Sequence, residues 1–282
     1  MLNKRLACLL ALLTAVLSSA CADLSSATRL RHADELAAVA GWQRIYLDAE
    51  PFRLAAYVPA RASGGAALTI YIEGDGLAFI TRSQVSLDPT PLRPTALQLA
   101  LRHPQGAAAY LARPCQYVAG TDARNCSATY WTDARFAAEV VTATDNAVDQ
   151  LKERAGARSL VLVGFSGGGA VAALVAARRS DVDMLITVAG NLDHRAWTDY
   201  HHVPPLTASL NAADAWQALA GLPQRHFMGS EDGVINRTVM ASYIARFPLG
   251  QRPQVRVIEG YDHHCCWARD WPALLAAEKL LH

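Results

Sequence analysis

The sequence lacks any run of basic residues and any surplus of charge of one sign. Its 26 lysines and arginines are balanced by 25 aspartates and glutamates, so the formal net charge is +1. A protein that binds a polyanion usually carries a basic patch or stripe. The balance therefore argues against nucleic acid as a partner. The 282 residues, 52% of them hydrophobic, are enough for one large domain with a substantial core.

The apolar run near the N-terminus is too short to cross a bilayer. Residues 6–17 make about a dozen positions, whereas a spanning helix needs about 20. The run follows Lys4 and Arg5 and precedes small residues, which is the layout of a secretory signal. We therefore expect residues 1–22 to be a signal peptide outside the fold, and the mature domain to be exported.

The end of this signal resembles a lipobox. In LSSAC, Cys21 would become the lipid-bearing first residue of a bacterial lipoprotein, although Leu17 lies one position too far away and Ser18 takes its place. Cleavage after Ala20 or Ala22 without lipidation is the alternative. The expected location is the outer membrane, through a lipid anchor at Cys21, or else the periplasm or the medium.

Cysteine is scarce, and the count suits an exported protein. Beyond the signal region four cysteines remain: Cys115, Cys126, Cys265 and Cys266. An even number in an exported chain indicates disulfides. Pairing Cys115 with Cys126 closes a short loop and leaves a bridge between two neighbours; each could also cross to the other pair. Reduced buried thiols are the remaining alternative.

Apolar runs alternate with helical patterns along the rest of the chain. Strands are expected at residues 44–49, 52–59, 67–76, 107–114, 159–166, 182–190, 224–232 and 254–260, the third of them running into glycines. Helices are expected at residues 93–104, 135–156, 168–179, 236–247 and 271–281. Continuous apolar strands alternating with helices predict an α/β fold with a mostly parallel central sheet covered by helices on both faces.

The chain shows no internal repeat and no low-complexity linker, which favours a single domain over residues 41–282. Residues 23–40 are expected to form a tether or a short helix ahead of it. One long excursion, about residues 191–221, lies between two predicted strands. A cap-like insertion over a pocket would emerge at that point.

Ser166 lies in LVLVGFSGGGAVAALVAARR, on a sharp turn between a buried strand and a helix. Gly164 and Gly168 are expected there because a side chain would collide with the neighbouring strand or helix. The turn places the hydroxyl at the carboxyl edge of the sheet, where open α/β sheets bind ligands. The helix that follows directs its amide dipoles at the same point.

GFSGG matches the G-x-S-x-G turn of the α/β-hydrolases, and the chain resembles that superfamily over about residues 41–282. Within it, the stretches YIEGDG, RPCQY, YWT..RF and DHHCCW are similar to a group of exported bacterial hydrolases of poorly defined substrate. The resemblance implies a single α/β-hydrolase domain and a nucleophile, an acid and a histidine in that order along the chain.

The acid and the histidine are sought after later strands, because a serine hydroxyl needs a base and the base needs an orienting group. The family position favours Asp232 over its neighbour Glu231, with Asp193 as a rival acid and a turn or helix cap as the alternative role of Asp232. Gly260 precedes His263 by three residues, as is frequent in the superfamily, so His263 is preferred over His264.

An oxyanion hole needs two backbone N–H groups. The resemblance assigns one to Gly167 and the other to Asp75, with Gly76 as the runner-up. Glu73 replaces the customary histidine of this loop. A plain turn is the alternative reading of the GDG sequence.

No cofactor or metal is expected. EGDGLAF has Phe79 where a dinucleotide fingerprint has its third glycine, and GFSGGG lacks the lysine of a phosphate loop. The neighbouring residues of DHHCC are spaced too closely for an ordinary zinc site. Five aromatic residues are candidates either for the pocket lining or for the core and loop anchors: Tyr130, Trp131, Trp197, Tyr200 and Trp267.

These features together predict a serine hydrolase that cleaves carboxylic esters through Ser166, His263 and Asp232 and an acyl-enzyme, with a small acyl compound as substrate. A peptidase or amidase with the same residues is the first alternative. A non-catalytic envelope binding module on the same fold is the second.

Overall fold

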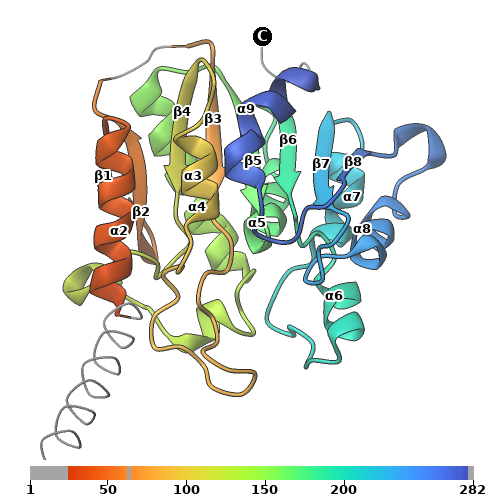
Figure 1. The fold of residues 1–282 in the computed structure, drawn as a ribbon, viewed down its shortest axis with the longest axis horizontal. Coiled ribbons are helices and arrows are strands. Elements are labelled where there is room, and N and C mark those ends of the chain that lie inside the picture. The colour runs from red at the N-terminus through yellow and green to blue at the C-terminus, as the bar shows by residue number, and fades with distance from the viewer. Residues whose placement is uncertain (1–24, 62–64, 279–282) are drawn as a thin grey trace, which may run out of the picture.

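The computed structural model describes residues 25–61 and 65–278 of the chain (Figure 1). The expected signal peptide at residues 1–22, and with it Cys21, lies outside these residues. Within them, no helix has both the length and the apolar character that a membrane crossing requires.

One sheet of eight strands organises the described part of the chain. Its spatial order is β1-β2-β4-β3-β5-β6-β7-β8; β1 pairs with β2 and β2 with β4 in antiparallel fashion, and all other neighbours are parallel. The strands are β1 (Trp42–Ala49), β2 (Phe52–Pro59), β3 (Ala67–Ile72), β4 (Ala107–Leu111), β5 (Ser159–Phe165), β6 (Val182–Val188), β7 (Gln224–Gly229) and β8 (Gln254–Ile258). All eight predicted strands are present, although β3 to β8 each end one to four residues earlier than expected, and the mostly parallel sheet is confirmed.

Helices cover both faces of the sheet, as predicted (Figure 1). One face packs against α2 (Ser26–Val39), α3 (Thr95–Ala100) and α9 (Trp267–Ala277). The other packs against α4 (Ala138–Ala155), α5 (Gly167–Ala176), α7 (Trp216–Leu219) and α8 (Arg237–Ile244). In β3, Tyr71 packs on the face covered by α2, α3 and α9, whereas Ile70 and Ile72 pack on the opposite face. Successive side chains of a strand point to opposite faces of the sheet.

The segment expected as a tether is a helix packed onto the domain. Ser25 caps α2 by accepting the amide of Thr28, and Ala33 and Ala37 are buried in the core beneath it. The buried Arg29 side chain donates to the carbonyl of Thr90 and pairs with Asp88 at 3.4 Å. Of the two expectations for residues 23–40, a tether or a short helix, the structure shows the helix, and small side chains let it lie close against the sheet.

Between β6 and β7, residues 191–221 carry α6 (His194–His201), a short 3-10 turn (Ala212–Ala215) and α7. The α6 segment and the long loop after β3 lie at the same end of the sheet (Figure 1). The last helix begins at Trp267, four residues before the expected start at Trp271, and carries Pro272 inside it. Proline fits best in a first helical turn, which is why the sequence pattern placed the start too late.

Two disulfides show which of the four cysteines pair with each other. Cys115 is bonded to Cys126, with their Cα atoms 5.5 Å apart, and Cys265 is bonded to Cys266. The first bridge fastens the loop that follows β4. The second lies directly after His263 and His264.

The docking of α2 can be tested with two neighbouring alanines in its last turns. Ala37 is 1% exposed, whereas Ala38 is exposed to solvent. Ala37→Asp would bury an unpaired carboxylate and should lower the free energy of unfolding by about 3 kcal/mol. Ala38→Asp, the matched control, should stay within about 1 kcal/mol of wild type in urea titrations. Equal stabilities of the two variants would mean that α2 does not dock.

Candidate active site

Ser166 lies on a turn that only small neighbours permit. Its backbone has φ of 51° and ψ of −123°, a strained conformation for a residue with a side chain. A methyl group on Gly164 would lie 2.3 Å from the carbonyl oxygen of Gly168, and one on Gly168 would lie 2.3 Å from that of Ile72. The predicted reason for these two glycines, collision with the neighbouring helix and strand, is confirmed.

The helix α5 starts immediately after Ser166 and is buried along its whole length. This explains its composition of glycine, alanine, valine and leucine, since a helix without a solvent face has no place for polar side chains. Its N-terminal amides have no partner within the helix. The sequence thus places a hydroxyl and free N–H groups at one point of the sheet's carboxyl edge.

His263 connects Ser166 to a buried carboxylate. Its Nε2 atom lies 3.1 Å from Ser166 Oγ, and its Nδ1 atom lies 2.9 Å from Asp232 Oδ2. A carboxylate can only accept, so Nδ1 donates and Nε2 is left to accept from the serine hydroxyl. Asp232, 4% exposed, also accepts the amides of Val234 and Ile235 through Oδ1, each at 2.8 Å. Asp232 therefore has both roles: Oδ1 accepts the amides of the following turn, and Oδ2 orients His263.

The rival residues lie elsewhere. His264 borders the same cavity but contacts neither Ser166 nor Asp232, and Glu231 is exposed. Asp193 caps α6 and accepts from Asn211 Nδ2 at 2.9 Å and Ser242 Oγ at 2.6 Å. Among the alternatives weighed from the sequence, only His263 contacts Ser166, and only Asp232 contacts His263.

The loop after β3 lies against the serine turn. A methyl group on Gly74 would be 3.3 Å from Ser166 Cβ, and one on Gly167 would be 2.1 Å from Asp75 Oδ1. The amides of Asp75, Gly76 and Gly167 donate to no other residue in the described part of the chain. The two expected positions, Gly167 and Asp75, are therefore adjacent, and their N–H groups are available.

Two buried arginines hold the Asp75 carboxylate. Arg113 Nη1 lies 3.2 Å from Oδ1, and Arg135 Nη1 lies 2.7 Å from Oδ2. Burial would raise the pKa of Asp75, but the two guanidinium groups outweigh it and hold the pKa below its ordinary value. Arg113 also donates to the carbonyl of Arg135. These contacts fasten the loop bearing Asp75 to the segments that follow β4 and precede α4.

Glu73 and Gln116 fix the same loop from behind. The buried Glu73 carboxylate accepts the amides of Gly74 at 3.0 Å, Ala96 at 3.2 Å and Leu97 at 3.4 Å, so it joins the loop to the first turn of α3. Burial raises the pKa of Glu73 to about 7, although the three amide donors each act to lower it. Gln116 Nε2 donates to the carbonyl of Gly74 at 2.9 Å.

A cavity of about 750 Å³ opens over Ser166 and His263. Of the five aromatic candidates only Trp197 borders it; Trp131 and Trp267 are buried anchors, Tyr130 packs edge-on against Phe52, and Tyr200 is exposed. The cavity is mostly apolar, with Arg93, Arg135 and His264 among its polar residues. In the described part of the chain, no three histidine, cysteine, aspartate or glutamate side chains are grouped to hold a metal ion.

Sequence reasoning assigned no role to Arg113, Gln116 or Arg135. All three occur in stretches that carried the family resemblance, RPCQY and YWT..RF, so the signal was present in the sequence. Their contact with Asp75 and Gly74 joins residues separated by 38, 42 and 60 positions, which no local pattern reveals.

Comparisons with known proteins agree on the fold. No protein-family model and no curated protein sequence matches the chain. Similar solved structures include an esterase from Pyrococcus furiosus (TM-score 0.57, 10% identity, 84% of this chain and 88% of that one). An alpha-beta serine hydrolase homologue from Coxiella burnetii has a TM-score of 0.54 at 13% identity (84% and 94%). A bacterial membrane phospholipase A has 0.53 at 18% identity (99% and 100%). The chain has the α/β-hydrolase fold.

The raised pKa of Glu73 predicts a pH-dependent stability. Because the folded protein holds this proton more tightly than the unfolded chain, the stabilisation is complete below the ordinary pKa of 4.5 and is lost as the pH rises through about 7. The unfolding free energy of wild type relative to Glu73→Gln should therefore fall by up to about 1.4 kcal/mol per pH unit in that window. Denaturant titrations across pH measure this.

The exposed Glu35 on α2 supplies a matched control for this measurement. Glu35→Gln removes one carboxylate without touching the buried loop, so its difference from wild type should change little across the same pH window. A Glu73→Gln difference that stays flat as well would show that the Glu73 carboxyl is not held protonated by burial.

Proposed function

We propose that this protein is a serine hydrolase that cleaves carboxylic esters. The observation that carries the proposal is the chain of contacts from Ser166 Oγ through His263 to Asp232, under an open cavity at the carboxyl edge of the sheet. Resemblance of the fold to an esterase and to a phospholipase supports the same reaction class.

Ser166 acts as the nucleophile in this proposal. His263 Nε2 takes the hydroxyl proton as Oγ attacks the acyl carbonyl, and the imidazolium then gives that proton to the leaving alcohol. Asp232 keeps Nδ1 protonated and stabilises the imidazolium. Its two backbone donors at Oδ1 hold the carboxylate in place for that task.

The oxyanion of the tetrahedral intermediate is assigned to the amides of Gly167 and Asp75. Both N–H groups have no other acceptor in the described residues, and the two positions adjoin. Arg113 and Arg135 neutralise the Asp75 carboxylate, which would otherwise place a negative charge beside the developing oxyanion. Water then attacks the acyl-enzyme with His263 as the base and releases the acid.

Export completes the proposal. The two disulfides suit an oxidising compartment, and the signal-like N-terminus suits secretion, with or without a lipid anchor at Cys21. A fold that only binds a ligand is the alternative, and an inert Ser166 would favour it.

Labelling with a fluorophosphonate probe tests the nucleophile. Wild type should be labelled at Ser166, and both Ser166→Ala and His263→Ala should lose labelling, whereas His264→Ala should keep it. Asp232→Asn should lower kcat on p-nitrophenyl butyrate by about 10³-fold or more, because the imidazole loses the group that sets its tautomer.

Asp193→Asn is the matched control for the acid. The Asp193 carboxylate caps α6 and contacts no group of the site. The variant should therefore lower the free energy of unfolding and leave kcat close to the wild-type value. Folded wild-type protein that resists the probe would contradict the proposed function, and loss of labelling in His264→Ala instead of His263→Ala would reassign the base.

Ester preference is a separate expectation. Amide cleavage demands efficient protonation of a poor leaving group, and the site offers only His263 for that task. We expect kcat/KM for p-nitrophenyl butyrate to exceed that for the p-nitroanilide of butyric acid by at least about 10³-fold. Comparable values for the two would favour a peptidase or amidase.

A further inference from the structure

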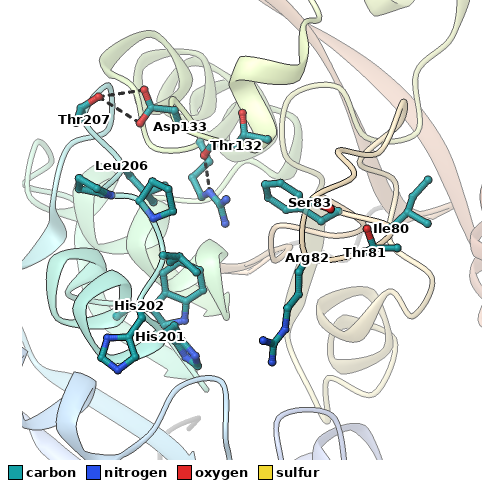
Figure 2. A pocket seen from close by; sticks show the side chains of 16 residues that line it. Ile80, Thr81, Arg82, Ser83, Thr132, Asp133, His201, His202, Leu206 and Thr207 are labelled. Atoms are coloured by element: carbon teal, nitrogen blue, oxygen red, sulfur yellow. Dashed lines mark hydrogen bonds between the residues drawn. The ribbon is translucent and has the colours of Figure 1, made fainter.

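A second, larger cleft adjoins the cavity over Ser166. It has a volume of about 1180 Å³ and shares Phe79, Arg135 and Trp197 with that cavity. It lies between the loop at residues 79–83 and the segment at residues 201–207 (Figure 2). Because three residues border both spaces, a ligand whose carbonyl lies at Ser166 can extend into this outer cleft. The combined volume of the two spaces is larger than the volume of a small ester.

One wall of the outer cleft is apolar and has almost no free backbone donor. It is formed by Val203, Pro204, Pro205 and Leu206. The prolines have no N–H group, and the amide of Val203 already donates to the carbonyl of Thr198 at 3.1 Å. Leu206 is buried in the core, which anchors the wall. A polypeptide strand would find few hydrogen-bond donors along this wall.

The opposite wall pairs part of its own backbone, although the amides of Thr81, Arg82 and Ser83 donate to no group in the described residues. Phe79 forms an antiparallel bridge with Val85, and the amide of Ile80 donates to Gln84 at 2.8 Å. The amide of Gln84 in turn donates to Thr81 Oγ1 at 3.1 Å. This loop is therefore a closed turn, and Phe79, 39% exposed, presents its ring at the junction of the two spaces.

Several polar groups inside the cleft have partners within the protein. Asp133 accepts from Thr207 Oγ1 at 3.2 Å, and His201 Nε2 lies 2.8 Å from the carbonyl of Val234 (Figure 2). Arg135 pairs with Asp75 and lies over the Trp197 ring, 5.8 Å from its centroid. The Nε1 atom of Trp197 is buried and has no hydrogen-bond partner among the described residues, whereas Arg82, Ser83 and His202 are exposed to solvent.

We propose that the outer cleft binds the unbranched apolar chain of a long-chain ester whose scissile carbonyl lies at Ser166. This inference rests on the proposed function and names its substrate class. The cleft lining is mostly apolar, so it can take a hydrocarbon chain out of water. Each methylene that leaves water for such a cleft strengthens binding about fourfold. The bound hydrocarbon chain belongs either to the acyl part or to the alcohol part of the ester.

Two substrate series test the inference, each used below its micelle-forming concentration. One runs from p-nitrophenyl acetate to the decanoate and varies the acyl chain; the other runs from ethyl to decyl acetate and varies the alcohol. We expect kcat/KM to rise with chain length by at least about tenfold in one series, which identifies the part of the ester that enters the cleft.

Two variants then locate the effect. Ser83→Trp places a bulky ring in the cleft, and Val203→Asp, at an exposed position, places a charge on its apolar wall. Each should reduce the ratio of long-chain to acetate kcat/KM by about tenfold or more. Ser180→Trp makes the same substitution at an exposed position distant from the cleft lining and should keep the wild-type ratio.

The outcomes separate this inference from the proposed function. If wild type is labelled by the fluorophosphonate and cleaves acetate, but shows no chain preference or one that both variants retain, the outer cleft is not the chain site and the hydrolase assignment stands. If wild type neither labels nor cleaves any ester, both fail. Faster cleavage of a peptide than of every ester would also overturn the inference.

Discussion

The close approach of backbone at the turn between β5 and α5 is the constraint on which the site depends. Gly164 and Gly168 leave less room than a methyl group needs, so α5 can begin directly at the end of β5 and against β3. Because of this contact, Ser166 points away from the core with the N-terminus of a buried helix behind it. A bulkier turn would separate the hydroxyl from the amides that surround it.

The rest of the site is positioned relative to that turn by buried polar contacts. Glu73 ties the loop after β3 to α3, and Arg113 and Arg135 clamp Asp75 against Gly167. Buried ion pairs contribute little to net stability, because desolvation offsets most of their attraction. Their value here lies in geometry: they hold backbone amides in a fixed place, where an oxyanion would need them without reorganisation.

The two spaces at the carboxyl edge differ in chemistry. Around Ser166 there are free backbone donors and a histidine, whereas the outer cleft has proline and aromatic side chains in its walls. A reacting carbonyl needs the first environment and a hydrocarbon chain needs the second. Their junction at Phe79, Arg135 and Trp197 lies where the loop after β3 meets α6 and the segment before α4, which are far apart in sequence.

The sequence by itself determined the order and type of the strands, most helices, and the serine turn, because periodicity and glycine spacing are local properties. It also narrowed the partners of Ser166 to two histidines and three acids. Only the tertiary structure decided that His263 contacts Ser166 and Asp232 contacts His263, that Cys115 pairs with Cys126, and that α2 is part of the domain. The same holds for the arginines at Asp75. Each of these depends on a contact between distant segments, where a shift of one residue on a loop exchanges one side chain for another.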